Sequence, residues 1–152
     1  MAARAGLDVV VVDKARFPRD KCCGDGLTTL ALRQLHALGF DPSTVPSWRD
    51  VDAAWLRSPS GREVRLPLPT EGRFAAVTPR IELDAALVDL ARQSGARVVE
   101  DTSFESIEAS DDRVTVRLRA ESGVSDLTAD WVIAADGMWS PVRKAQIGRA
   151  HV

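Results

Sequence analysis

The chain has 152 residues, of which 45% are hydrophobic and 28% are charged, and its formal net charge is −2. This composition is typical of an ordinary soluble domain, whose single core needs no disulfide or metal at this size. Lysine and arginine form no basic stripe, which gives no support for nucleic-acid binding. The apolar runs fall far short of the roughly twenty residues of a bilayer span. No signal-peptide pattern is present, so we expect a cytoplasmic location.

The two cysteines, Cys22 and Cys23, are adjacent in the sequence. Neighbouring cysteines seldom close a disulfide, and the second half of a zinc pattern is missing. The sequence therefore predicts two free thiols in a reducing compartment and no metal site.

The first predicted elements are a helix end and a strand. Residues 1–6 are rich in alanine and finish at Gly6, a good helix C-cap. Residues 7–13 are mostly valine and are polar only near their ends, which is typical of a strand buried on both faces of a parallel sheet. Residues 14–27, which contain Pro18, Gly24 and Gly26 among basic side chains, are predicted to be a loop.

The middle of the chain predicts one helix and one β-ribbon. Thr28 or Thr29 caps a helix that ends at Gly39. Its spacing of leucines predicts one buried face, made of Leu30, Leu32, Leu35 and Leu38. Residues 41–50 form a connection, and residues 54–56 and 63–68 form a ribbon around a turn at 58–61.

The last third predicts one more helix and several strands. The helix opens at Arg80, and Ser94 and Gly95 end it. Its apolar face consists of Leu83, Leu87, Leu90 and Ala91. Strands are expected at residues 96–100, 104–109, 114–119 and 131–135, the last of them buried, with a turn at 122–123.

Asp13 stands at the end of a buried strand that follows a helix. In dinucleotide-binding βαβ units this position holds an acid that accepts hydrogen bonds from the ribose hydroxyls of the adenosine half. The alternative is a polar residue at an ordinary strand end. The glycine-rich fingerprint that would decide between them does not occur before Asp13.

Two glycine-containing segments are further candidates. Residues 17–27 read FPRDKCCGDGL, in which the glycines let a ligand approach the backbone and the basic residues supply charge. The alternative is a surface loop with a small buried cysteine. Residues 135–143 read ADGMWSPVR and place Asp136 and Gly137 at a strand end. Ser140 is the expected N-cap of a following helix, a role compatible with binding.

The sequence resembles the geranylgeranyl reductase family of FAD-dependent oxidoreductases in the order and spacing of four segments. These are the acid after the valine strand, the KCCGDGL stretch, the RIELDAAL helix and the ADGMWSPVR segment. This family belongs to the p-hydroxybenzoate-hydroxylase-like group. The resemblance covers residues 1–145 and implies a Rossmann-like α/β domain that binds FAD or NAD(P), with an inserted β-ribbon and incomplete at both ends. The first strand and its G-x-G-x-x-G motif are missing, and Cys22 replaces the commoner family residue.

The resemblance also implies roles for particular residues. Asp13 would bind the adenosine ribose, Arg80 would lie near the FAD phosphates, and the backbone at Phe104 would border the adenine. Asp136 and Gly137 would meet the ribityl and pyrophosphate region. The remaining implied contacts, on the flavin and substrate side, are Cys23, Gly24, Asp25 and Gly26. Asp25 and Cys23 are the only candidates for a general acid, and His36 is expected at the surface or in the core.

Residues 146–152 do not continue the family pattern. The last six residues can be encoded by ATCGGAAGAGCACACGTC, a common sequencing-adapter sequence. We therefore expect a non-native tail, and its His151 is not a candidate.

The implied activity is reduction of isoprenoid carbon–carbon double bonds, with NAD(P)H or another donor reducing the FAD. An aromatic monooxygenase or halogenase would share the same binding residues. A non-enzymatic α/β binding module, with structural glycine turns, is a further alternative. We expect a small-molecule substrate, peripheral membrane association only through sequence outside this chain, and no activity from these residues alone.

Overall fold

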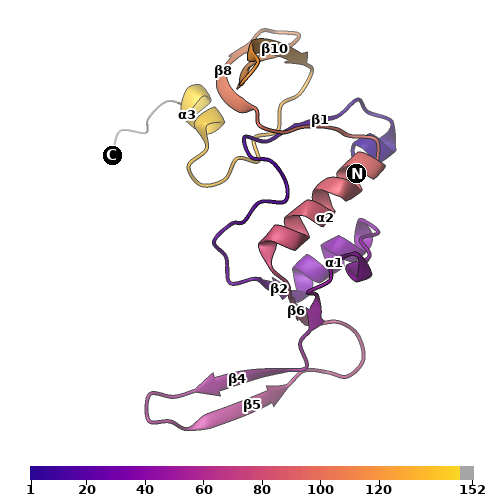
Figure 1. Ribbon diagram of the computed structural model, residues 1–152, viewed down its shortest axis with the longest axis vertical. Helices are drawn as coiled ribbons and strands as arrows, with labels where there is room; N and C mark the ends of the chain where they lie inside the picture. The colour runs from indigo at the N-terminus through magenta and orange to yellow at the C-terminus, as the bar shows by residue number, and fades with distance from the viewer. Residues whose placement is uncertain (148–152) are drawn as a thin grey trace. The chain divides into compact units, whose positions relative to one another are not determined.

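The structure, a computed structural model, describes residues 1–147 and has an α/β fold (Figure 1). This confirms the fold class expected from the sequence. The chain divides into two compact units. The first contains residues 1–9 and 17–97, and the second contains residues 10–16 together with the chain from Val98 onward.

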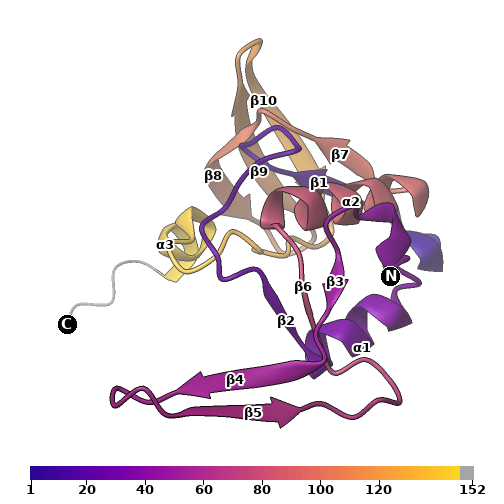
Figure 2. The ribbon, with the colours of Figure 1, turned by 60° about the horizontal axis from the view of Figure 1, so that its bottom comes forward.

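The first unit contains two α-helices, α1 and α2 (Figure 2). Residues of both helices pack in one hydrophobic core. Helix α1 (Thr29–Ala37) is capped by Thr28, whose hydroxyl accepts a hydrogen bond from the Ala31 amide at 3.4 Å, as predicted. Helix α2 (Arg80–Gln93) begins after Pro79 and ends at Ser94. The core consists of the buried Phe40, Val45 and Leu83, against which Leu27, Leu35, Trp48, Ala86, Leu87 and Leu90 pack.

The predicted faces of these helices are largely correct. Leu83, Leu87 and Leu90 of α2 belong to the core, and Leu32 of α1 is buried. Leu30 is 66% exposed, so its predicted burial is wrong. It occupies the first turn of α1, ahead of the residues that face the core.

Short strands in the first unit form a three-stranded antiparallel sheet in the order β2-β6-β3. Its strands are β2 (Gly26–Thr28), β3 (Arg49–Asp50) and β6 (Ala75–Val77). Residues 26–27 were predicted to lie in a loop, and this prediction is wrong because they belong to β2. Strands of two or three residues are too short to display an alternating pattern.

A two-stranded antiparallel ribbon extends from the same unit, as predicted (Figure 2). It pairs β4 (Ala53–Arg57) with β5 (Glu63–Pro67), and Trp55 lies opposite Arg65. The N-terminal segment ends in a 3₁₀ turn (Ala3–Ala5), and Gly6 adopts a φ of 85° as its C-cap. A second 3₁₀ turn covers Pro42–Thr44.

Strand β1 (Val10–Val12) pairs with β7 (Arg97–Val99). The Arg97 amide donates a hydrogen bond to the Val9 carbonyl, and the Asp13 amide donates one to the Val99 carbonyl. The residue numbers of the bonded partners increase together along both strands, which is typical of parallel pairing. Val11 is 37% exposed, so the predicted burial on both faces is wrong for the described chain. The reason is that this sheet has only two strands among residues 1–147.

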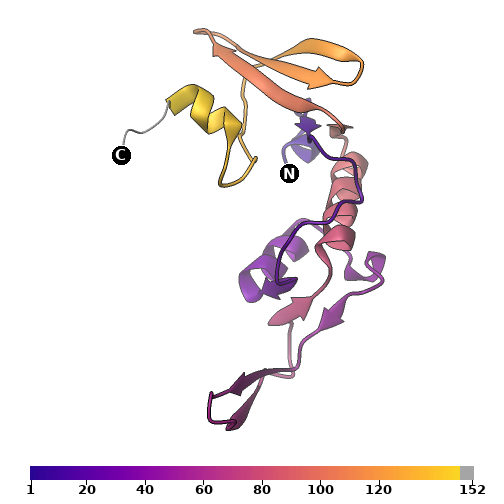
Figure 3. The ribbon, with the colours of Figure 1, turned by 60° about the vertical axis from the view of Figure 1, so that its left-hand side comes forward.

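The second unit contains an antiparallel meander and a short helix (Figure 3). Its strands are β8 (Ser103–Ala109), β9 (Val114–Ala120) and β10 (Gly123–Ala129), with β9 in the centre. Val116 and Leu118 of β9 are buried. Helix α3 (Pro141–Ile147) contacts β8. The first two strands were predicted, and β10 was not.

The predicted buried strand at residues 131–135 does not form. Within the part of the chain that the structure describes, no strand pairs with this segment, and Trp131 and Ile133 are 87% and 89% exposed. An apolar run becomes a buried strand only when neighbouring strands accept and donate its backbone hydrogen bonds.

Helix α3 includes the first two positions of the expected tail, and the rest of residues 146–152 lies outside the described residues. Among the helices within residues 1–147, none combines the length and the hydropathy needed to cross a bilayer.

Candidate functional site

Asp25 fixes the glycine-containing loop to the start of α2. Its carbonyl accepts a hydrogen bond from the Thr78 amide at 2.9 Å, and its carboxylate accepts one from the Arg80 amide at 3.2 Å. Asp25 has a φ of 53°, a left-handed conformation that non-glycine residues rarely adopt. The carboxylate thus satisfies an amide that the first turn of a helix leaves without an intrahelical partner. Asp25 therefore has a structural role, since it holds the loop against the start of α2.

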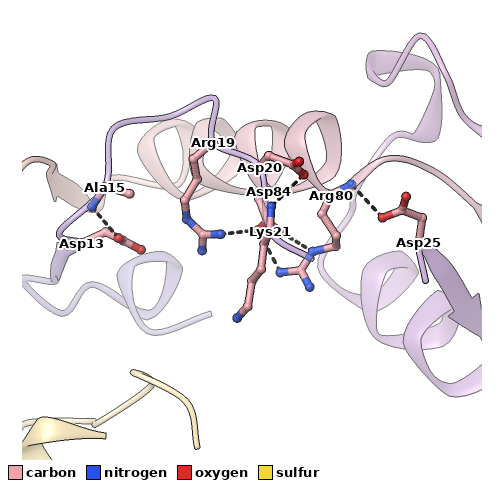
Figure 4. A network of polar contacts seen from close by, with 8 residues as sticks. All are labelled: Asp13, Ala15, Arg19, Asp20, Lys21, Asp25, Arg80 and Asp84. Atoms are coloured by element: carbon pink, nitrogen blue, oxygen red, sulfur yellow. Dashed lines mark hydrogen bonds and ion pairs between the residues drawn. The ribbon is translucent and has the colours of Figure 1, made fainter. Parts of the chain in front are cut away.

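Two guanidinium groups meet at Asp84 (Figure 4). The Nε and Nη2 atoms of Arg80 each donate a hydrogen bond of 2.8 Å to the Asp84 carboxylate, and Arg19 Nη1 lies 3.4 Å from it. Asp84 is buried, whereas the side chains of Arg19 and Arg80 are 25% and 26% exposed. Two cations share one carboxylate, so these three residues carry a net positive charge at the N-terminal end of α2. We call them the arginine cluster.

Sequence reasoning missed the part that Asp84 plays. Asp84 is not among the site residues predicted from the sequence, and it orients Arg80 through two parallel hydrogen bonds. The spacing of four residues between Arg80 and Asp84 was the available signal, because such pairs lie on the same helix face.

Cys22 and Cys23 are both exposed and both free, as expected for thiols outside a disulfide. The alternative of a small buried cysteine is therefore wrong. The pKa of the Cys23 thiol is lowered because the Asp25 backbone N–H and then the Arg80 guanidinium hydrogen-bond to its sulfur. Desolvation and the Asp25 charge oppose this shift. Cys23 therefore favours its thiolate form more than an ordinary cysteine does.

The two loop glycines leave space beside the backbone. A Cβ atom at Gly24 would meet no atom within 4 Å, and one at Gly26 would only touch the Gly24 carbonyl at 3.8 Å. Neither glycine is among the residues with positive φ. The chain's own conformation therefore does not require glycine at 24, and the open space is compatible with a ligand that contacts the backbone.

Asp13 follows β1 and is half-buried in the second unit. Its carboxylate accepts a hydrogen bond from the Ala15 amide at 2.8 Å (Figure 4). Its backbone carbonyl accepts one from the Thr102 amide at 3.0 Å. Phe104 is half-buried in β8 opposite Leu118, next to a register shift. Both residues are held by backbone pairing around the start of β8.

Asp136 and Gly137 form a turn that leads into α3. The Asp136 carboxylate accepts a hydrogen bond from the Val142 amide at 3.2 Å. The Ser140 hydroxyl and this amide lower the pKa of Asp136. Gly137 has a φ of 84°, which favours glycine. Ser140 accepts a hydrogen bond from the Arg143 amide at 2.9 Å, so the predicted N-cap is confirmed.

An open cavity of about 640 Å³ borders this turn in the second unit. It is lined by Ile107, Val114, Trp131, Val132, Asp136 and Gly137, among others. The candidate residues thus fall into two groups. The first unit brings together Cys23, Gly24, Gly26 and Arg80, and the second contains Asp13, Phe104, Asp136 and Gly137.

Taken separately, each group offers chemistry that suits part of a dinucleotide. The arginine cluster offers guanidinium donors of net positive charge, which suit a pyrophosphate. A carboxylate directly after a parallel strand suits ribose hydroxyls. Fold and residues together define an α/β domain of the nucleotide-cofactor-binding class.

The family model for the FAD binding domain matches residues 1–149, and the chain belongs to this family. The coarser part of the expected resemblance is thereby confirmed. The chain is 34% identical to the menaquinone reductase of Mycobacterium tuberculosis over 97% of this chain and 36% of the relative. It is 43% identical to the menaquinone reductase of Mycolicibacterium smegmatis over 70% of this chain and 26% of the relative.

A third relative is the 3-(3-hydroxy-phenyl)propionate/3-hydroxycinnamic acid hydroxylase of Escherichia coli, which is 29% identical over 91% of this chain and 26% of the relative. The chain therefore spans about a third, or less, of the length of these relatives.

Two solved structures have the same fold. The p-nitrophenol 4-monooxygenase of Pseudomonas putida has a TM-score of 0.77 at 21% identity, over 97% of this chain and 40% of that protein. A geranylgeranyl bacteriochlorophyll reductase-like protein of Thermoplasma acidophilum has a TM-score of 0.74 at 25% identity, over 90% of this chain and 34% of that protein.

Proposed function

We propose that the chain binds FAD within an FAD-dependent oxidoreductase that reduces carbon–carbon double bonds of an isoprenoid. The observation that carries the binding of FAD is the arginine cluster, in which Asp84 holds two partly exposed guanidinium groups at the start of α2. Such an arrangement recognises a pyrophosphate by charge and by paired N–H donors.

Each candidate residue has a role in this proposal. Arg80, oriented by Asp84 and supported by Arg19, binds the FAD phosphates. Asp13 accepts hydrogen bonds from the adenosine ribose, and the backbone at Phe104 borders the adenine. In the second unit, Asp136 and Gly137 contact the ribityl and pyrophosphate region. In the first unit, Cys23, Gly24 and Gly26 lie towards the flavin and the substrate.

Bound FAD supplies the hydride and electron chemistry of the reaction. The chain's own residues bind and orient it. Asp25 holds the loop at the start of α2, and Asp84 fixes the plane of the Arg80 guanidinium, so that the donors are in place before the cofactor arrives. Because Asp25 already accepts the Arg80 amide, we assign it a positioning role instead of acid catalysis.

The proposed substrate class is an isoprenoid quinone. Its support is the name menaquinone reductase, which two relatives carry at 34% and 43% identity. The geranylgeranyl reductase-like structural neighbour supports an isoprenoid chain as the group that reacts. NAD(P)H is the proposed electron donor.

An aromatic hydroxylase is the second candidate function. It is supported by the hydroxyphenylpropionate hydroxylase relative and by the p-nitrophenol monooxygenase neighbour. It would use the same FAD-binding residues, so the arginine cluster does not discriminate between the two functions.

Two measurements test the proposal. First, titration of the chain with FAD should quench flavin fluorescence, and the absence of quenching would favour a non-enzymatic α/β module. Second, the protein expressed from its own gene should oxidise NADPH in the presence of menaquinone and yield a quinone with one double bond fewer. Oxygen-dependent hydroxylation of 3-(3-hydroxyphenyl)propionate, with menaquinone unchanged, would instead establish the second candidate.

A further inference from the structure

We infer that Trp139 and Lys144 form a docking site for the nicotinamide half of the electron donor. The indole ring stacks on the nicotinamide ring, and the ammonium group binds the adjoining phosphate. This inference deepens the proposed function and rests on it, because NAD(P)H is the electron donor proposed there. It is carried by a turn of restrained geometry that presents a tryptophan and a cation to solvent.

Hydrogen bonds to α3 restrain the turn between Asp136 and Ser140. The Asp136 carboxylate accepts one from the Val142 amide at 3.2 Å, and the Ser140 hydroxyl accepts one from the Arg143 amide at 2.9 Å. The Arg143 guanidinium donates another, of 3.3 Å, to the Met138 carbonyl at the tip of the turn. The backbone of this turn is therefore held in place before any ligand binds.

Two large side chains project from the restrained turn. Met138 is 75% exposed and Trp139 is 74% exposed. An indole ring in water forgoes the stabilisation that its burial would give, so a rigid segment that presents one is typical of a binding surface. The flexible thioether of Met138 adapts to a neighbouring ring, which suits the flank of a stacked ligand.

Lys144 places a positive charge beside the indole. Its ammonium nitrogen lies 5.9 Å from the centre of the Trp139 ring, in a cation–π contact. Lys144 and its neighbour Arg143 are both exposed on α3, in the same unit as the turn. An aromatic ring with cations at its edge suits a ligand that combines a planar ring with a phosphate.

A nicotinamide nucleotide matches this combination. The oxidised nicotinamide ring is a cation, and cations are attracted to the face of indole more strongly than to other aromatic side chains. The phosphate next to its ribose supplies the negative charge that an exposed ammonium binds. In the proposed function, Asp136 and Gly137 contact the ribityl chain, which bears the flavin ring. A ring stacked on Trp139, two positions further along the chain, adjoins the flavin, as a hydride donor must.

The test titrates the protein expressed from its own gene with nicotinamide mononucleotide and follows binding by isothermal titration calorimetry. W139L should weaken this binding about tenfold, the size expected for the loss of one stacked ring. W139F keeps an aromatic ring and should restore the affinity to within about threefold of the unaltered protein. W55L removes a tryptophan of similar exposure, 65%, from the β4-β5 ribbon and should leave the affinity unchanged.

A second pair of variants tests the phosphate contact. K144Q should weaken the binding of nicotinamide mononucleotide about threefold, as expected for an exposed charge pair. The same variant should leave the binding of nicotinamide riboside, which lacks the phosphate, unchanged. R113Q removes an exposed arginine from the turn between β8 and β9 and should alter neither affinity. Circular dichroism checks that each variant is folded.

Each of three results would contradict the inference. The first is that W139L binds nicotinamide mononucleotide as tightly as the unaltered protein, or that neither binds it. The second is an equal loss of affinity in W55L. The third is that W139L loses affinity for adenosine monophosphate to the same extent, which would assign an adenine ring to the site. Flavin absorbance of the same preparations reports FAD binding separately, so a protein that holds FAD but fails these tests contradicts this inference alone.

Discussion

Arg80 and Asp84, one turn apart on α2, are joined by two parallel hydrogen bonds of 2.8 Å. This contact fixes the plane of the guanidinium, and the amide of Arg80 donates a hydrogen bond to Asp25 in the loop that carries Cys23. Arg19, from that loop, approaches the same carboxylate. One buried acid thus positions two basic side chains from different elements, which is why the cluster is more than a surface ion pair.

We expect D84N to destabilise the chain by about 1–3 kcal/mol, because two partly buried guanidinium groups lose their shared counter-charge. Urea unfolding, followed by circular dichroism, measures the change. D89N is the matched control, since Asp89 pairs with Arg92 on an exposed face of the same helix. Its effect should stay within about 0.5 kcal/mol. Equal midpoints for both variants would show that Asp84 has no special role.

We expect R80K to weaken FAD binding about tenfold while leaving the fold intact. Lysine keeps the charge but lacks the planar pair of donors that binds Asp84 on one side and a phosphate on another. The measurement is the dissociation constant from flavin fluorescence quenching, where tenfold corresponds to about 1.4 kcal/mol. R92K provides the control for an arginine-to-lysine change on α2. Unchanged affinity in R80K would place the FAD phosphates elsewhere.

The sequence predicts well where local chemistry decides the structure. Helix α2 was predicted from its leucine spacing and from its start at Arg80, and the same leucines fill the core. The ribbon was predicted because its alternation is clear and its turn contains Pro59 and Gly61. Ser140 was identified as an N-cap because serine, when it precedes a proline at the first helical position, is a strong helix start signal.

The sequence predicts the structure poorly where a segment depends on contacts with residues that are distant along the chain. The run at residues 131–135 is as apolar as a buried strand, but its backbone finds no strand partner within residues 1–147. Gly26 and Leu27 form β2 only because Ala76 and Val77 lie opposite them. The role of Asp84 depends on Arg19, which is 65 positions away, so no local pattern could reveal the full cluster.

We expect G24A to preserve the fold and to weaken FAD binding. The open space beside Gly24 accommodates a methyl group, and its φ is not positive, so the chain itself is not strained. A cofactor that contacts this backbone would meet the new methyl group. Thermal unfolding and FAD titration measure the two effects separately. G61A, in the ribbon turn, is the contrasting variant. Because Gly61 has a φ of 83°, this change should lower stability by about 1 kcal/mol and leave FAD affinity unchanged.

We expect Glu82 to make the stability of the first unit depend on pH. Its carboxylate accepts hydrogen bonds from the Ser47 hydroxyl and amide at 2.6 and 2.9 Å, and these bonds lower the pKa of Glu82 below its ordinary value of 4.5. A depressed folded-state pKa means that the stabilisation is fully present above the ordinary value and is lost as the pH falls through the lower, folded-state value.

E82Q should therefore have a lower melting temperature than the unaltered chain at neutral pH. The difference should shrink as the pH falls through the lowered pKa of Glu82, because the unaltered carboxylate then also becomes neutral. Thermal melts across this range measure it. E71Q removes a glutamate charge from an exposed loop position and controls for net charge. A difference that persists undiminished at low pH would mean that the shape of the glutamine, and not the lost carboxylate charge, weakens the contact with Ser47.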